Sequence, residues 1–478
     1  MRDITEAPSL EADTIVIGAG LAGITAAREL KAAGQAVCLL EARERVGGRV
    51  ANHDLGDGKV VELGAEFFGP ANTIIADTAR SLGIESHRTY DEGYRLLELD
   101  GRIRRWKGLI PARSPQVLAD VGQAALRLER MARSIPDEAP WNAANAVAWD
   151  SQTFWSWTQR NLRTAQGRRL VALMVNVTLC ATPADASLLH VAYYAKGAGG
   201  FRALTKTGGG VQENRFVGGA GRIPLALGAP VADDTYTGAV VRELEHRRDS
   251  VVVKGSGFKA HGRRVIVAVP IPLAGRIAYD PPLPGMRDQV TQRMPAGSAI
   301  KVLAVYDEPF WRTEGLNGVA TSLHGPIRAV VDGSPPEAEP GVLSCFVTGP
   351  AARALSGVAR PERREAILGA LARFFGPRAS RPTELVEQDW MREEFTRGCY
   401  HCLAPPGLYT QYGRALREPV GRIHWAGAET VPLEMGSMGG AVDSGRRAAR
   451  EVLAYDADEE APVGEAPAAE AVPATREA

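Results

Sequence analysis

The segment Gly18-Ala19-Gly20-Leu21-Ala22-Gly23 constrains the fold more than any other part of the sequence. It follows an apolar run at residues 14–17 that is typical of a β-strand, and it opens a helical pattern that continues to about residue 33. A second apolar run at residues 37–40 ends at Glu41. This order of strand, glycine turn, helix and strand predicts a βαβ unit and therefore an α/β fold.

The spacing of these glycines indicates a dinucleotide site. Gly18 makes the tight turn, Gly20 lets a pyrophosphate approach the helix N-terminus, and Gly23 allows the helix to pack closely on the strand. Glu41 follows about twenty residues later, where its carboxylate can accept a hydrogen bond from a ribose hydroxyl. A plain glycine-rich turn is the alternative. The cofactor contacts that we expect here come from Gly18, Gly20, Leu21, Ala22, Gly23 and Glu41.

The residues after Glu41 distinguish between FAD and NAD. They read Ala42-Arg43-Glu44-Arg45-Val46-Gly47-Gly48-Arg49, which resembles the E-A-R-x-R-x-G-G-R run of flavoproteins with two dinucleotide-binding domains. Gly48 permits close approach of the backbone, and Arg43 and Arg49 can donate to phosphate or isoalloxazine oxygens. The resemblance favours FAD, with Ala42 as a further contact, over the cofactor of an NAD-dependent dehydrogenase.

The chain has 478 residues, which is room for roughly two to three domains and for a bulky cofactor. Strand and helix patterns alternate along it, and a late strand followed by a helical pattern returns to the opening unit. We predict a mixed α/β fold in which a discontinuous Rossmann-like FAD-binding domain carries an inserted substrate-binding domain of helices and a mixed sheet. The first comprises residues 12–86, 217–291 and 393–455, and the second comprises residues 87–216 and 292–392.

Two local expectations accompany this division. In the helix predicted at residues 117–131, the helical spacing places Leu118, Val121, Ala125 and Leu128 on one apolar face. Residues 456–478 are rich in Ala, Glu and Pro, so we predict a disordered acidic tail there.

Composition excludes some partners. The 56 basic and 56 acidic residues balance, so nucleic acid is not an expected partner. Five scattered cysteines are too few for a disulfide framework and favour a reducing compartment, which we interpret as the cytoplasm. The sequence has no signal-like start and no apolar run of about 18 residues, so we expect no membrane span. No metal site is predicted, and a homodimer is one assembly that the residues allow.

Further segments resemble the flavin monoamine oxidases. They occur in the family's order at residues 63–70, 209–219, 298–301, 308–311, 390–414 and 421–441. The resemblance implies additional cofactor contacts from Gly64, Ala65, Glu66, Val241, Cys399, Gly427, Glu429, Ser437, Met438 and Ala441.

The resemblance also implies the activity. An amine is oxidised by passage of a hydride equivalent from the carbon beside nitrogen to the flavin, water hydrolyses the resulting imine, and O2 becomes hydrogen peroxide. By position, Lys301 holds a water near the flavin, Trp390 flanks the flavin, and Tyr400 forms one wall of an aromatic cage. An edge lysine and an ordinary core tryptophan are the alternatives. The substrate cavity is expected to be lined by Phe67, Asn176, Val177, Gln212, Tyr400 and Ser437.

Two residues depart from the family pattern. Ser437 stands where the second cage wall is normally a tyrosine, which removes about 0.5–1 kcal/mol of contact with the amine and enlarges the pocket. Simple arylalkylamines are therefore not the expected substrates. Glu434 is interpreted as a solvated loop carboxylate, with the binding of a diamine's second ammonium as the alternative.

Two alternatives to the oxidation of a simple amine remain open. A related flavin oxidase or dehydrogenase could act on a cyclic alkaloid amine, a polyamine or an amino acid. A flavin-binding scaffold without catalysis is a third reading.

The pair Cys399 and Cys402 fits neither a thioredoxin-like motif nor half of a zinc site, because it runs into Pro405 and Pro406 and has no second ligand pair. Cys399 falls instead on the cysteine that carries the flavin as a thioether in some monoamine oxidases, and Cys402 is interpreted as packing. Covalent and non-covalent FAD both remain open at this point.

Overall fold

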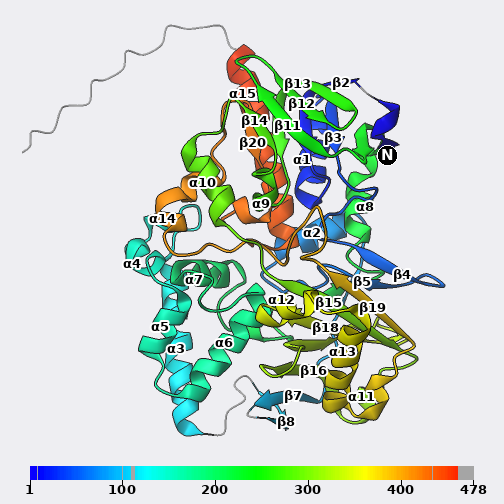
Figure 1. Ribbon diagram of the computed structural model, residues 1–478, viewed down its shortest axis with the longest axis vertical. Helices are drawn as coiled ribbons and strands as arrows, with labels where there is room; N and C mark the ends of the chain where they lie inside the picture. Colours follow the sequence, from blue (N-terminus) through cyan, green and yellow to red (C-terminus); the bar gives the residue numbers. More distant parts are fainter. Residues whose placement is uncertain (8, 100, 109–113, 433, 461–478) are drawn as a thin grey trace, which may run out of the picture.

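The computed structural model describes residues 1–7, 9–99, 101–108, 114–432 and 434–460, and two sheets organise them (Figure 1). The larger sheet has nine strands within these residues, in the order β1-β10-β3-β2-β13-β12-β11-β14, with β20 also paired to β13. The strands are β1 (Arg2–Asp3), β2 (Ser9–Ile17), β3 (Val37–Leu40), β10 (Thr235–Thr237), β11 (Val241–His246), β12 (Val251–Gly255), β13 (Phe258–Val267), β14 (Ala278–Asp280) and β20 (Ile423–Trp425).

The centre of this sheet is parallel and covered by helices. β3, β2, β13 and β20 run in one direction, and their apolar residues are buried on both faces, which explains why they read as continuous hydrophobic runs. Helices α1 (Leu21–Ala32) and α15 (Met438–Glu460) lie against each other beside the sheet (Figure 1). Their close approach needs Gly445, because a Cβ there would lie 2.3 Å from the carbonyl oxygen of Ala22. The predicted βαβ opening is confirmed.

The second sheet has the order β19-β15-β18-β17-β16-β7-β8 and is mainly antiparallel. Side chains alternate across its strand β15, so Ile300 and Val302 pack towards helix α13 while Lys301 and Leu303 face the other way. On that other face, Leu303 packs in one cluster with Val61 and Leu63. The strands are β7 (Tyr94–Leu99), β8 (Arg102–Trp106), β15 (Ala299–Tyr306), β16 (Leu316–Ser322), β17 (Ala329–Asp332), β18 (Gly341–Thr348) and β19 (Glu384–Asp389), and the covering helices are α12 (Pro350–Ser356) and α13 (Arg360–Phe375).

A group of helices packs beside the second sheet (Figure 1). Its members are α3 (Pro115–Ser134), α5 (Phe154–Asn161), α6 (Ala165–Leu179) and α7 (Leu188–Gly197). The remaining helices and short strands are α2 (Thr73–Ser81), α4 (Ala146–Asp150), α8 (Arg222–Gly228), α9 (Ile271–Ala274), α10 (Gly285–Arg293), α11 (Phe310–Thr313), α14 (Leu408–Tyr412), β4 (Asn52–Gly56), β5 (Lys59–Glu62), β6 (Ser86–Arg88) and β9 (Asn214–Phe216).

The predicted buried face of α3 is confirmed at Leu128 and wrong at Leu118. Leu118 is 38% exposed, whereas Val117, Ala124 and Leu128 are buried. The buried face also contains Asp120, whose carboxylate accepts hydrogen bonds from the backbone and hydroxyl of Thr164 at the start of α6. A buried carboxylate that bonds the N-cap residue of another helix breaks the apolar pattern on which the expectation depended.

The predicted tail also begins too early. Helix α15 continues through Glu460, and Asp456 lies within it. The Asp456 carboxylate accepts hydrogen bonds from Arg264 Nε at 2.7 Å and from Gln35 Nε2 at 2.6 Å. These two contacts hold the last turns of the helix against the sheet. Residues 461–478 of the predicted tail lie outside the described residues. Among the described helices, none is both long and apolar enough to cross a membrane.

We expect Asp456→Ala to lower the free energy of unfolding by about 1.5–3 kcal/mol, because hydrogen bonds to a buried guanidinium are lost. The thermal unfolding midpoint measures the effect. Asp77→Ala is the control, because it breaks an ion pair with Arg80 whose side chains are 66% and 76% exposed, and such a pair contributes less than about 1 kcal/mol. Equal shifts for the two variants would contradict the role assigned to Asp456.

Candidate active site

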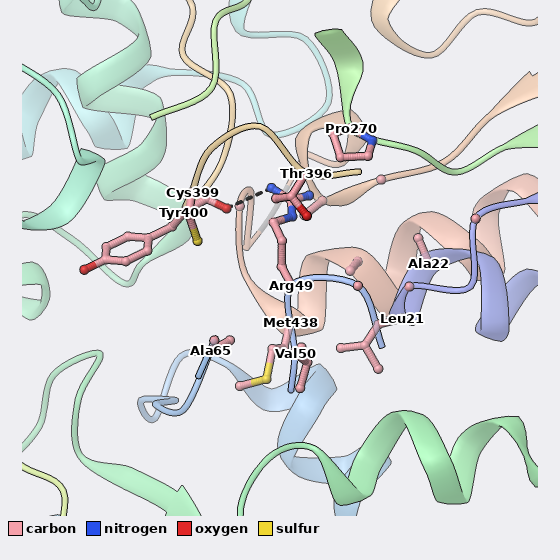
Figure 2. Close-up of a pocket in the computed structure, with 18 of the residues that line it drawn as sticks. Leu21, Ala22, Arg49, Val50, Ala65, Pro270, Thr396, Cys399, Tyr400 and Met438 are labelled. Carbon is pink, nitrogen blue, oxygen red and sulfur yellow. Dashed lines mark hydrogen bonds between the residues drawn. The ribbon is translucent and has the colours of Figure 1, made fainter. Parts of the chain in front are cut away.

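A cavity between the two sheets collects most of the predicted site residues. It runs from the glycine turn before α1 to a wall formed by Tyr400 and the helices beside the second sheet. Figure 2 places Leu21 and Ala22 at one end of the view, Tyr400 at the other and Arg49 between them. The predicted residues that line it are Gly18, Gly20, Leu21, Ala22, Glu41, Ala42, Arg43, Gly48, Arg49, Gly64, Ala65, Glu66, Phe67, Val177, Gln212, Val241, Cys399, Tyr400, Gly427, Ser437, Met438 and Ala441.

The glycine turn has the geometry of a phosphate cradle. Gly18 has φ +101°, a conformation that favours glycine, and a Cβ on Gly23 would lie 1.9 Å from the carbonyl oxygen of Gly18. Gly20 is the N-cap of α1, and the space where its Cβ would stand is open. Open space in front of a helix N-terminus accepts a pyrophosphate, so this end of the cavity fits a dinucleotide such as FAD.

Glu41 ends β3 as a buried carboxylate. Its Oε2 accepts a hydrogen bond from the backbone N–H of Ala19 at 2.8 Å, and its Oε1 accepts from that of Arg43 at 3.0 Å. The Arg43 side chain turns towards residues 393–396 and donates to Glu393 and Thr396. Both side chains are therefore held in place at the edge of the cavity.

Arg49 forms the central ion pair of the site. Its Nη1 and Nη2 donate to the two oxygens of Glu429 at 2.7 and 3.2 Å, and Nη1 also donates to the carbonyl oxygen of Tyr400 at 2.8 Å (Figure 2). Burial alone would raise the pKa of Glu429, but the charge and hydrogen bonds of Arg49 outweigh it and lower the pKa to about 2. Glu429 also accepts from the backbone N–H of Cys402. The pair thus orients the segment that contains Tyr400.

Lys301 is buried behind the cavity wall. Its Nζ donates to the carbonyl oxygen of Gly64 at 2.9 Å and lies 3.1 Å from Glu66 Oε1. Burial raises the pKa of Glu66, against the opposing effect of Lys301 and Arg215. Arg215 in turn pairs with Glu62. Lys301 lies on a central strand and has a charged partner, so the alternative of a solvent-facing edge lysine is excluded.

Several predicted residues stand behind the lining of the cavity. Lys301 and Trp390 both support residues 63–66 from the rear, since Trp390 Nε1 donates to the carbonyl oxygen of Leu63 at 3.0 Å. Gly23 packs on Gly18, and Glu429 lies behind Arg49. Asn176 is directed along its own helix, where its Nδ2 donates to the carbonyl oxygen of Ala172, and it is not among the lining residues.

The far end of the cavity has aromatic and apolar walls. The rings of Tyr400 and Phe346 meet edge to face with centroids 6.2 Å apart, and Phe67 and Val177 pack against the same cluster. Tyr194 of α7 also lines this end. Neither Phe346 nor Tyr194 is identified from the sequence, because each lies in an apolar strand or helix without a local marker. Such walls favour an apolar ligand body and the neutral form of an amine.

Glu434 differs from its expected role. It is only 5% exposed and lines the cavity, so its interpretation as a solvated loop carboxylate is wrong. The side chain turns inwards because Asn72 and the backbone N–H of Ile74 at the start of α2 donate to it. Those donors lie some 360 positions earlier in the chain, so no local pattern could indicate the burial.

Comparisons with known proteins agree with this geometry. The model of the family of flavin-containing amine oxidoreductases matches residues 21–453. Flavin-containing amine oxidase B of Sus scrofa is 34% identical over 450 residues, which cover 93% of this chain and 86% of that protein. Putrescine oxidase bound to putrescine superposes with a TM-score of 0.89 at 32% identity, over 94% of this chain and 100% of that one. Cyclohexylamine oxidase from Brevibacterium oxydans also gives 0.89, at 29% identity, over 93% and 99%.

The chain therefore belongs to the flavin-containing amine oxidoreductases. It is an FAD-dependent oxidoreductase that oxidises amines. The glycine turn and the cavity that extends from it fit the FAD that this family uses.

His401 lies beside the site as a neutral side chain. Its ring stacks on Tyr194 with centroids 4.7 Å apart, and within the described residues neither ring nitrogen has a hydrogen-bond partner. Burial lowers the pKa of His401 to about 4. Since the unfolded chain has a histidine pKa of about 6.5, the unfolded state binds more protons between these values, and stability is lost as the pH falls from about 6.5 to 4.

We expect His401→Phe to reduce this acid sensitivity, because phenylalanine keeps the stacking on Tyr194 and cannot be protonated. The thermal unfolding midpoint, measured from pH 7 to pH 4, should fall less steeply in the variant than in the wild type. His261→Gln, at an exposed position on β13, is the control. Parallel curves for wild type and His401→Phe would show that His401 does not carry the effect.

Proposed function

We propose that the protein oxidises an amine at the Tyr400 end of the cavity and passes the electrons to O2, which forms hydrogen peroxide. The observation that carries this proposal is the continuity of one cavity from the Gly18 turn to Tyr400. Gly18, Gly20 and Glu41 would hold a dinucleotide at the turn, and it would supply the oxidising group for an amine enclosed by the Tyr400 wall. The geometry thus supports direct contact between the cofactor and the substrate.

The residues of this chain bind the amine and orient it. When bound, FAD supplies the oxidising group, which accepts a hydride equivalent from the carbon beside the amine nitrogen and is reoxidised by O2. Tyr400, Phe346 and Phe67 enclose the amine and exclude water from it. Their apolar surroundings favour the uncharged nitrogen whose lone pair the reaction needs. No side chain has to act as a base in this scheme.

We assign supporting roles to the residues behind the lining. Lys301 keeps a cation close to the reacting end, and Glu66 balances that charge 3.1 Å away. Trp390 holds the backbone of residues 63–66 against the cavity. Asn176 has no assigned role, because its amide bonds within its own helix.

The two sheets suggest two domains with different functions. We propose that residues 12–86, 217–291 and 393–455, which supply most of the larger sheet, form the FAD-binding domain. Residues 87–216 and 292–392, which supply the second sheet and the neighbouring helices, would form the substrate-binding domain.

All five cysteines are free and buried, which supports a reducing compartment such as the cytoplasm.

Anaerobic addition of amines to the purified holoenzyme tests the proposed function. We expect the oxidised flavin absorbance to bleach with amines, and hydrogen peroxide to form in equal amount to the aldehyde or ketone after air is admitted. A panel of monoamines, diamines, cyclic amines and amino acids separates the rivals. Bleaching by amino acids alone would assign a different substrate class, and no bleaching by any compound would leave only a flavin-binding role.

We further propose that FAD is bound to Cys399 through a thioether, because Cys399 lines the cavity beside Tyr400 whereas Cys402 does not. Acid precipitation of the wild type should leave the yellow colour in the pellet. Cys399→Ala should release it to the supernatant, and Cys402→Ala, the matched control, should keep it in the pellet. A yellow supernatant from the wild type would contradict covalent attachment.

A further inference from the structure

Glu434 is a buried carboxylate that faces the cavity without a cation. It is 5% exposed and lines the same cavity as Tyr400 and Ser437. Its oxygens accept hydrogen bonds from Asn72 Nδ2 at 3.1 Å, from Ser437 Oγ at 3.3 Å and from the backbone N–H of Ile74 at 3.4 Å. All three donors are neutral, so the negative charge has no cationic partner within the part of the chain that the structure describes.

The other buried carboxylates at the site are paired. Glu66 lies 3.1 Å from Lys301, Glu429 forms two bonds with Arg49, and Glu41 lies 3.5 Å from Arg43. None of the ion pairs formed within the described ranges includes Glu434. Burial raises the pKa of Glu434, and the negative charge of Asp443 acts in the same direction. Buried charges are normally matched by an opposite charge, so the site lacks one.

Local geometry keeps a place open for this carboxylate. A Cβ on Gly439 would lie 2.0 Å from Glu434 Oε2, so the absence of a side chain at position 439 provides the space that the carboxylate fills. Ser437 lines the cavity beside Glu434, and its hydroxyl donates to that carboxylate at 3.3 Å. Glu434 therefore lies at the surface of the cavity while it remains shielded from bulk water.

We propose that Glu434 binds a second ammonium group of the substrate, and that the protein therefore selects diamines or polyamines over monoamines. This rests on the proposed function, since one amine must reach the Tyr400 end while the other donates to Glu434. The second ammonium donates to the Glu434 carboxylate, and the Ser437 hydroxyl offers a further acceptor. The substrate then supplies the cation that the protein lacks.

A structural role for Glu434 makes a different prediction. Asn72 is the N-cap of α2 and Ile74 lies in its first turn, so the carboxylate also satisfies donors at that helix N-terminus. If this were its only role, removal of the charge would weaken the fold and the binding of every amine alike. Selective loss of diamine binding distinguishes the two roles.

The test uses holoenzyme reduced with dithionite, which binds amines but cannot oxidise them. Isothermal titration calorimetry gives the Kd of linear α,ω-diamines and of monoamines with the same number of carbons. In the wild type, we expect one range of diamine lengths to bind more tightly than the matched monoamines. In Glu434→Gln, the Kd of the best diamine should rise about 10- to 100-fold, as for a charge-assisted hydrogen bond, while monoamine binding stays within about twofold.

Two further variants sharpen the result. Glu434→Asp keeps the charge but withdraws it by one methylene, so the preferred diamine should become longer by about one carbon. Asp443→Asn removes a carboxylate charge near Glu434 that does not line the cavity, and it should leave the ratio of diamine to monoamine affinity unchanged. If Glu434→Gln does not retain FAD, the Glu434→Asp measurement still tests whether Glu434 binds the second ammonium group.

Three results would overturn the proposal: no diamine binds the wild type better than its matched monoamine, Glu434→Gln weakens both series equally, or Glu434→Asp leaves the preferred length unchanged. Failure of the proposed function looks different. In that case no amine of either series bleaches the oxidised flavin anaerobically. Bleaching by monoamines and diamines alike, without a diamine preference, would retain amine oxidation and reject only the role of Glu434.

Discussion

The buried ion pair of Arg49 and Glu429 is the interaction on which the shape of the site depends. Arg49 follows the first βαβ unit, Glu429 precedes the last helix, and the same guanidinium holds the carbonyl oxygen of Tyr400. Segments from the beginning and the end of the sequence are thus joined at one point. Because Arg49 lowers the pKa of Glu429 to about 2, the pair is charged at neutral pH. Two-point contact also fixes the direction of the guanidinium plane.

Charge balance extends behind the cavity wall. Lys301, Glu66, Arg215 and Glu62 alternate in sign beneath residues 63–66, so each buried charge is offset by a neighbour. A buried pair of this kind contributes little net stability but is costly to break, which suits a role in holding geometry. Among the described residues no cation pairs with Glu434, and the proposed second ammonium of the substrate would supply one.

The sequence predicts those parts of the structure whose constraints are local. Gly18 and Gly23 can be identified because a positive φ and a 1.9 Å approach admit only glycine, so the constraint appears in the residues themselves. The burial of Glu434 depends on α2, which is remote in sequence, and no nearby residue marks it. The face of α3 is misplaced because buried Asp120 bonds Thr164, the N-cap residue of another helix. Residues that support the cavity from behind, such as Lys301, are found by resemblance, but their position relative to the lining requires the three-dimensional packing.

Arg49 holds Tyr400 by its backbone carbonyl and leaves the ring free of that contact. The position of this loop is therefore independent of which side chain stands at residue 400. Substrate selectivity can change by replacement of the ring while the cofactor end keeps its architecture. The contact that positions the loop is thus separate from the ring that faces the ligand, and one scaffold can serve amines of very different shape.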